Sequence, residues 1–386
     1  MRKGHIIFTG GYQKMASGAG SKKRPPKRKF KKRKIALLVV ELLALVVAIV
    51  ALVIVIKTTN KKTGIKNFEL NSEDISVNAG VKEEYETNEK LLNHTEIAFF
   101  GVDAREKKAD LSKSTRTDTI MVCSINEDTK EIRLASVYRD TYLNVGNDTY
   151  NKCNSAYAMG GYEQAINMLN MNLDLNIQSF ITVGFQGVIS AVDAVGGVDI
   201  DVQENEISHL NNYQASIYAT EEDPHKLITD YTPVTKPGMQ TLNGQQALAY
   251  CRIRYIGSDF QRTERQRAVL QQIMLKAQKM NPTQLNQLTT DVFPLIATNF
   301  KFEDLVSRIS EIGQYKIVST TGFPFSDGLT TGMIGSKGSC VVPIDLESNV
   351  IELHKFFYPD VEYTPSQDVV NYSEKIHADT SPYVGR

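Results

Sequence analysis

The chain has 386 residues, 41% hydrophobic and 23% charged, with 25 glycines and 12 prolines. This composition excludes a disordered chain, a collagen-like repeat and a small disulfide scaffold. The 44 basic and 44 acidic residues cancel, but they are unevenly distributed. Residues 1–34 contain 13 lysines and arginines and no acidic residue, whereas the chain from residue 57 onward carries 31 basic against 43 acidic groups.

Residues 35–56 form an apolar run that only one charge, Glu41, interrupts. At about 1.5 Å per residue, a helix of this length would extend about 33 Å, enough to cross a bilayer. The run is too long for the apolar stretch of a cleaved signal peptide, and no small-residue cleavage site follows it. We therefore expect a basic cytoplasmic tail (1–34), a single uncleaved transmembrane helix (35–56) and an extracytoplasmic remainder, as the positive-inside rule indicates.

Beyond this helix, the sequence predicts a stalk followed by one α/β domain. Residues 57–95 are polar and show no sustained apolar period. From residue 96, short apolar runs alternate with helical patterns, which is typical of an α/β domain with a parallel or mixed sheet. We expect this domain to span 96–358, with a loose tail over 359–386.

The elements follow in chain order. Strands are predicted at 97–102, 119–125 and 131–137, the last two forming a hairpin; a helix at 162–173; a strand at 180–183; a helix ending near 196; and a strand at 198–202. Residues 203–238 are polar and indicate a surface insertion. A short helix is expected at 243–250 and a long one from Asp259, a plausible N-cap, to Met280, before Pro282.

Charged residues gather at the ends of the predicted strands. Asp103 follows the first strand, Arg116 and Asp118 precede the second, and Arg139 follows the third. Ligands of open α/β sheets bind beyond the carboxyl ends of the strands, so these positions indicate a site. Two carboxylates brought together there would suit a divalent cation.

A second cationic group surrounds the start of the long helix. Arg262, Arg265 and Gln266 share one helix face, and helix N-termini attract anions. Arg252 and Arg254 alternate, so in an extended segment both point to one side. A lone surface arginine is usually solvated or weakly paired. The combined set favours phosphate or diphosphate recognition, since arginine binds phosphate bidentately.

Several motifs together resemble the LytR-CpsA-Psr family. They are Phe100-Gly101-Val102-Asp103-Ala104-Arg105, Arg116-Thr117-Asp118-Thr119, Tyr138-Arg139-Asp140-Thr141, Asn151-Lys152-Cys153-Asn154, Asp193-Ala194-Val195-Gly196-Gly197, Leu242-Asn243-Gly244-Gln245-Gln246-Ala247, Arg252-Ile253-Arg254 and Arg262-Thr263-Glu264-Arg265-Gln266. They occur in family order over roughly residues 96–280. Two departures are Tyr138, where many members have proline, and cysteines at positions 123, 153 and 251.

The resemblance implies a membrane-anchored envelope enzyme with a three-layer α/β/α domain around a central mixed sheet. Such enzymes transfer a glycopolymer, such as teichoic acid or capsule, from an undecaprenyl diphosphate carrier to peptidoglycan through a phosphodiester, with Mg²⁺. By this resemblance, Asp103 and Asp118 hold the metal, and Asp103 and Arg139 act in catalysis. The resemblance also implies which residues bind the diphosphate: Arg116, Arg139, Arg252, Arg254, Arg262, Arg265 and Gln266. The expected partners are the lipid-linked glycopolymer, peptidoglycan and the membrane, without nucleic acid.

Two other functions stay open from sequence: a membrane-tethered protein that binds lipid-linked sugars or regulates envelope synthesis, and a polyprenyl diphosphatase. A binder would not need the two aspartates together with the arginines.

Two structural predictions follow. The first is a lipid tunnel lined by some of Ile166, Met168, Leu169, Met171, Phe180, Ile181, Phe185, Val188, Ile189 and Val192, for each of which an ordinary core position is equally plausible. The second is a Cys153–Cys251 disulfide, since disulfides persist outside the cytoplasm.

Overall fold

The computed structural model describes residues 66–70, 73–106, 109–112, 116–219, 223 and 226–384, all within the compact unit that spans 59–386. The predicted cytoplasmic tail and transmembrane helix, residues 1–56, lie outside these ranges. Within them, no helix combines the length and the apolar character that crossing a bilayer requires.

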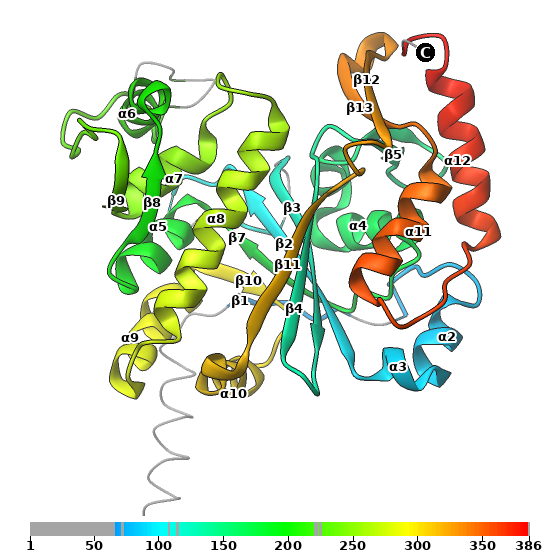
Figure 1. Cartoon of the computed structure of the whole chain (residues 1–386), viewed down its shortest axis with the longest axis horizontal. Helices are drawn as coiled ribbons and strands as arrows, with labels where there is room; N and C mark the ends of the chain where they lie inside the picture. The colour runs from blue at the N-terminus through cyan, green and yellow to red at the C-terminus, as the bar shows by residue number, and fades with distance from the viewer. Residues whose placement is uncertain are drawn as a thin grey trace, which may run out of the picture. The chain divides into compact units, whose positions relative to one another are not determined.

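A seven-stranded mixed sheet forms the centre of the described part (Figure 1). Its strands, in spatial order, are β1 (Lys66–Asn67), β10 (Ile296–Thr298), β7 (Ser179–Val183), β2 (His94–Val102), β3 (Thr117–Asn126), β4 (Glu131–Val137) and β11 (Lys316–Phe323). β2 pairs antiparallel with β3 and parallel with β7, and β3 and β4 form the predicted hairpin. The central mixed sheet expected from the sequence is confirmed.

Helices lie on both sides of this sheet in Figure 1. One side carries α2 (Val81–Thr87), α3 (Glu89–Leu92), α4 (Ser155–Leu173), α11 (Leu346–Phe357) and α12 (Gln367–Thr380). The other carries α5 (Phe185–Ala194), α7 (Gly244–Arg252), α8 (Asp259–Ala277), α9 (Pro282–Val292) and α10 (Phe302–Ser310). Three two-stranded sheets flank these layers: β5 (Tyr142–Asn144) with β6 (Tyr150–Lys152), β8 (Val198–Val202) with β9 (Gly238–Leu242), and β12 (Leu329–Met333) with β13 (Ser339–Pro343).

The largest apolar core belongs to the α4 side of the sheet. Phe100 and Val122 from the sheet are fully buried there with Ile166, Met168 and Leu169 of α4. These α4 residues therefore pack as core, and the tunnel prediction is wrong for them. The sequence shows that a helix is apolar but not which neighbour covers it.

Residues 73–92 differ from the expected stalk, because they fold onto the domain. Ile75, Val81, Tyr85 and Leu91 are buried in the main core, and the Tyr85 hydroxyl lies 2.8 Å from that of Tyr358. This segment contains α2 and α3, which have seven and four residues and expose most of their charged side chains. Its composition therefore resembles that of a polar linker, which is why the sequence predicted a stalk.

The expected loose tail is also folded. Val369 and Ile376 of α12 are buried in the main core. Asp174, at the end of α4, accepts hydrogen bonds from the Asn78 side chain, from the Tyr363 hydroxyl at 2.6 Å and from the Ser366 backbone at 2.7 Å. One buried carboxylate thus ties the two ends of the domain to α4.

The polar segment 203–238 contains a helix, α6 (Ile207–Ala215), which sequence patterning missed. α4 begins seven residues earlier than predicted and breaks at Gly160–Gly161. Gly161 has a φ of 69°, and a Cβ there would lie 2.3 Å from the Ser112 carbonyl oxygen, so this break requires glycine.

The predicted disulfide is wrong. Cys153 and Cys251 are both free thiols. Cys153 is buried, and its sulfur donates to the carbonyl oxygens of Tyr138 and Arg139. The thiol therefore stabilises the turn after β4 instead of pairing.

Candidate functional site

The site lies where β2 ends and β3 begins. The register between these strands shifts at Gly101 and Val102, which pair with Thr119 and Thr117. Asp118 sits at this irregularity, and Asp103 follows directly after β2. Because β2 and β3 are antiparallel neighbours, both aspartates belong to one edge of the sheet, as the sequence predicts.

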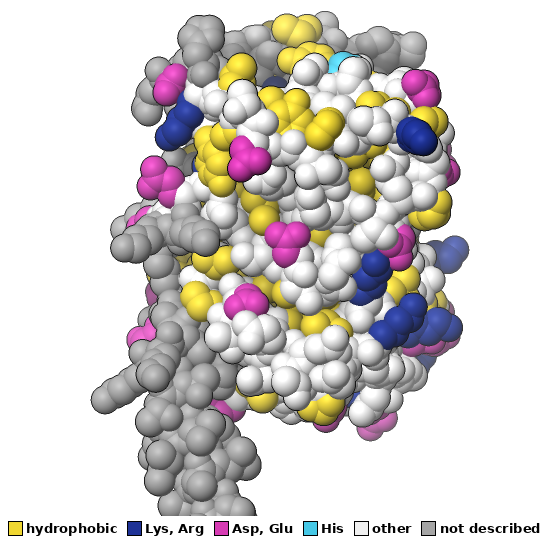
Figure 2. Space-filling view, turned by 90° about the vertical axis from the view of Figure 1, so that its left-hand side faces the viewer, with side chains coloured by type: hydrophobic (Ala, Val, Ile, Leu, Met, Phe, Trp, Pro, Cys, Tyr) yellow, Lys and Arg dark blue, Asp and Glu magenta, His cyan; other side chains and the backbone are white. Residues whose placement is uncertain are grey.

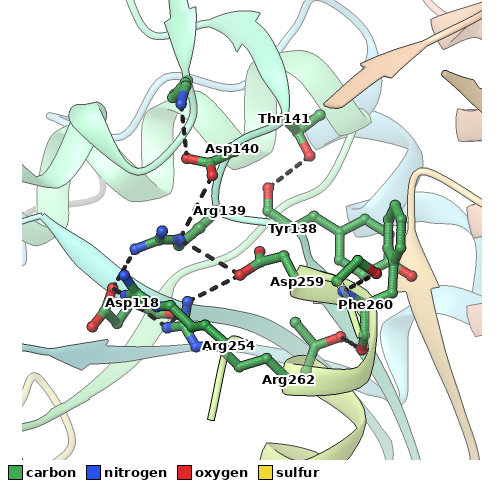
Figure 3. Close-up of polar contacts among 12 residues, drawn as sticks. Asp118, Tyr138, Arg139, Asp140, Thr141, Arg254, Asp259, Phe260 and Arg262 are labelled. Carbon is green, nitrogen blue, oxygen red and sulfur yellow. Dashed lines mark hydrogen bonds and ion pairs between the residues drawn. The ribbon is translucent and has the colours of Figure 1, made fainter. Parts of the chain in front are cut away.

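Three arginines from different elements converge on Asp118 (Figure 3). Its Oδ1 accepts from Arg139 at 2.7 Å and from Arg254 at 2.8 Å. Arg262, from the first turn of α8, lies 3.4 Å from the same oxygen and also donates to the Asp118 carbonyl. Of the four residues predicted to share one cleft, Asp118, Arg139 and Arg262 therefore contact one another, together with Arg254, whereas Asp103 pairs with Arg105.

Asp259, the first residue of α8, joins the cluster from the opposite side. Its Oδ1 accepts from Arg262 at 3.0 Å and lies 3.6 Å from Arg139. Its Oδ2 is buried and has no hydrogen-bond partner. Ser258 caps the helix and the Phe260 ring packs edge-on against Tyr138 at 4.5 Å, so the start of α8 is fixed beside the turn that carries Arg139.

The charges of this cluster perturb one another. Burial alone would raise the pKa of Asp118, but Arg262, Arg254 and Arg139 outweigh it and hold the pKa below its usual value. Burial lowers the pKa of Arg262, whose side chain is only 2% exposed. The three guanidiniums of Arg139, Arg254 and Arg262 face the two carboxylates of Asp118 and Asp259, which leaves an excess of positive charge among these five groups.

Several guanidinium groups at this edge have buried N–H groups without an acceptor. They are Nε of Arg139 and of Arg262, and Nη1 of Arg105 and of Arg252. An unsatisfied buried donor costs about 1–3 kcal/mol, and more when it is charged. Four such groups at one edge of the sheet suit an anion with several acceptor oxygens.

Arg105 was not among the predicted site residues. It donates to both oxygens of Asp103, at 2.6 and 2.8 Å. Arg105 and Arg252 both approach the Phe185 ring, at 5.5 and 4.8 Å from its centroid. Burial, followed by the charge of Arg105, lowers the pKa of Arg252, which also feels the charges of Asp103 and Asp118. The sequence signal for Arg105 was its place two residues after Asp103.

The remaining predicted diphosphate-binding residues outside this group are Arg265, Gln266 and Arg116, and each has a different environment. Arg265 is buried and donates to Glu206 at 2.8 Å and to the carbonyls of Ile253 and Ile256 at 3.2 Å, so it holds the segment that carries Arg254. Gln266 borders the cavity described next, with its Oε1 buried and unpaired. Arg116 is exposed just before β3.

An apolar cavity of about 150 Å³ opens onto the arginines. Its walls come from the sheet and from α5, α7 and α8 and include Phe99, Met121, Val183, Phe185, Val188, Leu248, Val269, Leu270 and Ile273; Asp118, Arg252, Arg262 and Gln266 border it. Of the residues predicted to line a tunnel, only Phe185 and Val188 do so. The apolar cavity therefore exists on the face of the sheet opposite α4.

The two predicted metal ligands fit a Mg²⁺ ion only in part. Mg²⁺ is usually held by one or two carboxylates together with substrate phosphate oxygens and water. Asp118 has its Oδ1 engaged by arginines, and both oxygens of Asp103 accept from Arg105. Among the described residues, no group of three or more His, Cys, Asp or Glu is arranged to hold a metal. The donor set is therefore incomplete for Mg²⁺ without phosphate oxygens of a substrate.

Comparison with known proteins identifies the family. The LytR_cpsA_psr family matches residues 53–338, and the chain belongs to this family. It is 29% identical over 189 residues to Biofilm regulatory protein A of Streptococcus mutans, covering 47% of this chain and 43% of the relative. It is also 29% identical over 242 residues to the polyisoprenyl-teichoic acid–peptidoglycan teichoic acid transferase TagU of Enterococcus faecalis, covering 59% and 72%.

Solved structures share the fold. A protein of Streptococcus agalactiae superposes with a TM-score of 0.56 at 23% identity, covering 78% of this chain and 98% of that chain. The structure of TagT bound to LI-WTA gives a TM-score of 0.50 at 18% identity, covering 76% and 93%. The α/β architecture around the site is thus that of the family.

Proposed function

We propose that this protein transfers a glycopolymer from a polyprenyl diphosphate carrier to peptidoglycan, joining them through a phosphodiester. The observation that carries the proposal is an apolar cavity that opens onto buried arginines with unpaired N–H groups. The apolar walls suit the isoprene units next to the diphosphate, and the diphosphate suits the arginines. Relatives named as teichoic acid–peptidoglycan teichoic acid transferases support the same assignment.

In the proposed reaction, a peptidoglycan hydroxyl attacks the sugar-linked phosphorus. A P–O bond forms, the bond between this phosphorus and the bridging oxygen breaks, and its electron pair leaves with the polyprenyl phosphate. Arg139 and Arg262 neutralise the charge on the transferring group, a contribution of several kcal/mol in phosphoryl transfer. Mg²⁺, held by Asp103, Asp118 and phosphate oxygens, would supply further positive charge there.

The hydroxyl proton needs an acceptor. Asp103 is the candidate from sequence, but both its oxygens accept from Arg105. The Oδ2 of Asp259 is buried beside Arg139 and Arg262 without a partner. In a site built for phosphate oxygens, such a carboxylate oxygen suits a ligand that donates a proton. We assign the general base to Asp259 and keep Asp103 for the metal.

The proposed setting is the outer face of the cell membrane, with residues 35–56 as the anchor and residues 1–34 in the cytoplasm. The concentration of 13 basic residues before the apolar run supports this orientation.

A product assay tests the function. The full-length protein is incubated with peptidoglycan, Mg²⁺ and a lipid-linked glycan that carries a radioactive sugar. A transferase moves the label into the insoluble peptidoglycan. A diphosphatase releases a soluble sugar phosphate, and a binding protein leaves the donor intact; either result contradicts the proposal.

A further inference from the structure

The segment after Arg254 presents an exposed aromatic ring at the edge of the arginine cluster. The Tyr255 side chain is 82% exposed, whereas Ile253, two positions before it, is fully buried. Arg254 itself reaches back to Asp118 at 2.8 Å. The backbone thus places a cation in the cluster and a tyrosine in solvent at consecutive positions.

A second ring covers one side of this tyrosine. His209 of α6 stacks on Tyr255, with ring centroids 5.8 Å apart and planes 26° from parallel. One turn further along α6, the Tyr213 ring lies 5.2 Å from the guanidinium of Arg252. Because residues four apart share a helix face, the His209 and Tyr213 rings of α6 both lie beside the end of α7 and the following loop, which carry Arg252 and Arg254.

A buried ion pair fixes the loop that carries Tyr255. Arg265 binds the carbonyls of Ile253 and Ile256 on both sides of Tyr255, and its charge is balanced by the buried Glu206 at 2.8 Å. A buried pair of this kind contributes little net stability. It does fix the position of the loop, and an exposed ring on a fixed loop loses little entropy when it binds a ligand.

We propose that Tyr255 and His209 form a stacking subsite for a sugar ring next to the diphosphate. This inference rests on the proposed function. An aromatic ring offers a flat apolar face and polar edge groups, which match the C–H face and the hydroxyls of a pyranose. Figure 2, which views the molecule from the side of α6, β8 and β9, shows hydrophobic and uncharged polar side chains with acidic side chains scattered among them.

The sugar could belong to the lipid-linked donor or to the peptidoglycan acceptor, and binding measurements separate the two sources. The probes are a short-chain polyprenyl diphosphate without sugar, the same lipid carrying one N-acetylhexosamine, and a soluble peptidoglycan glycan fragment. We expect Tyr255→Ala to weaken binding of one sugar-bearing probe about tenfold, the value of one good aromatic contact. Binding of the sugar-free lipid should stay unchanged.

Further variants complete the test. Tyr255→Phe keeps the ring and should bind within about twofold of the unmodified protein, His209→Ala should give an intermediate loss, and Tyr383→Ala removes a half-exposed tyrosine from the C-terminal end as a control. Unchanged affinity of Tyr255→Ala for both sugar-bearing probes, or an equal loss for the sugar-free lipid, overturns the subsite. If the unmodified protein does not bind the sugar-free lipid, the proposed function itself fails.

Discussion

Arg139 lies between two carboxylates and still has a buried N–H without an acceptor. A donor aimed at the transferring phosphoryl group acts mainly in the transition state, so we expect Arg139→Ala to lower kcat by about 10²–10³. Its effect on the free energy of unfolding should be small, because the side chain is partly exposed. Steady-state kinetics and thermal unfolding together check both parts.

The control for Arg139 is Arg133→Ala. Arg133 lies on the same strand pair at the far end of the hairpin and is only loosely paired with Glu131, at 3.8 Å. Its removal should leave kcat unchanged. A normal kcat in Arg139→Ala would end the assignment of this arginine to the diphosphate.

Asp259 and Asp103 can be distinguished by their asparagine variants. We expect Asp259→Asn to lower kcat by about 10²–10⁴ and to remove the acidic limb of the pH–rate profile, because the proton acceptor is lost. Asp103→Asn should keep that limb, but its activity should require a higher concentration of Mg²⁺. The profiles are measured at saturating donor. If Asp259→Asn retains the acidic limb, the proton goes elsewhere and Asp103 becomes the stronger candidate.

Glu96 predicts a pH dependence of stability unrelated to catalysis. Burial raises its pKa to about 7, even though the Tyr358 hydroxyl donates to it at 2.7 Å. Between the unfolded pKa of about 4.5 and the folded value, the folded state holds more protons, so the free energy of unfolding falls as pH rises. The total fall is roughly 3 kcal/mol.

Denaturant unfolding of the unmodified protein and of Glu96→Gln, from pH 4.5 to 7.5, measures this dependence. Glutamine does not titrate, so the variant should gain stability relative to the unmodified protein as pH rises. Parallel curves for the two proteins would show that Glu96 ionises normally in the folded state.

At the scale of elements, α8 and the loop before it depend on the Glu206–Arg265 pair. Removing one partner leaves the other charge buried and unpaired, which costs about 3–5 kcal/mol. Arg265→Met should therefore destabilise the protein strongly, and adding Glu206→Met should recover part of the loss. Lys375→Met, which breaks an exposed pair with Asp379, is the control and should cost less than about 0.5 kcal/mol. A smaller loss in Arg265→Met than in this control would contradict the role of the pair.

The strands β2, β3, β4, β7 and β8 were predictable from sequence, because they are apolar runs bounded by polar residues. The proximity of Asp118 and Arg139 was predictable because strand ends meet at one edge of a sheet, whereas Arg262, on α8, was expected there from the family resemblance. The structural role of Arg265 could not be predicted from sequence, because its partner Glu206 lies 59 positions away. Of the two helices expected to line the cavity, α5 does so and α4 does not, since hydrophobicity does not reveal which face remains open.

At the scale of the whole molecule, the ends of the described chain are part of the domain. Asp174 accepts hydrogen bonds from residues before β2 and after α11, so segments nearly 290 positions apart meet at one carboxylate. Their polar composition concealed this from sequence reasoning. The site edge, with β2, β3 and β4, therefore rests on a core that both ends complete.

The central claim is that the phosphorus nearest the sugar moves to peptidoglycan. A lipid-linked donor labelled with ³²P only at that phosphorus measures it directly, with peptidoglycan as the acceptor. The account predicts that the label enters the insoluble peptidoglycan as a phosphodiester while unlabelled polyprenyl monophosphate is released in equal amount. Label that stays on the lipid, or appears as a soluble phosphate without any in peptidoglycan, would contradict it.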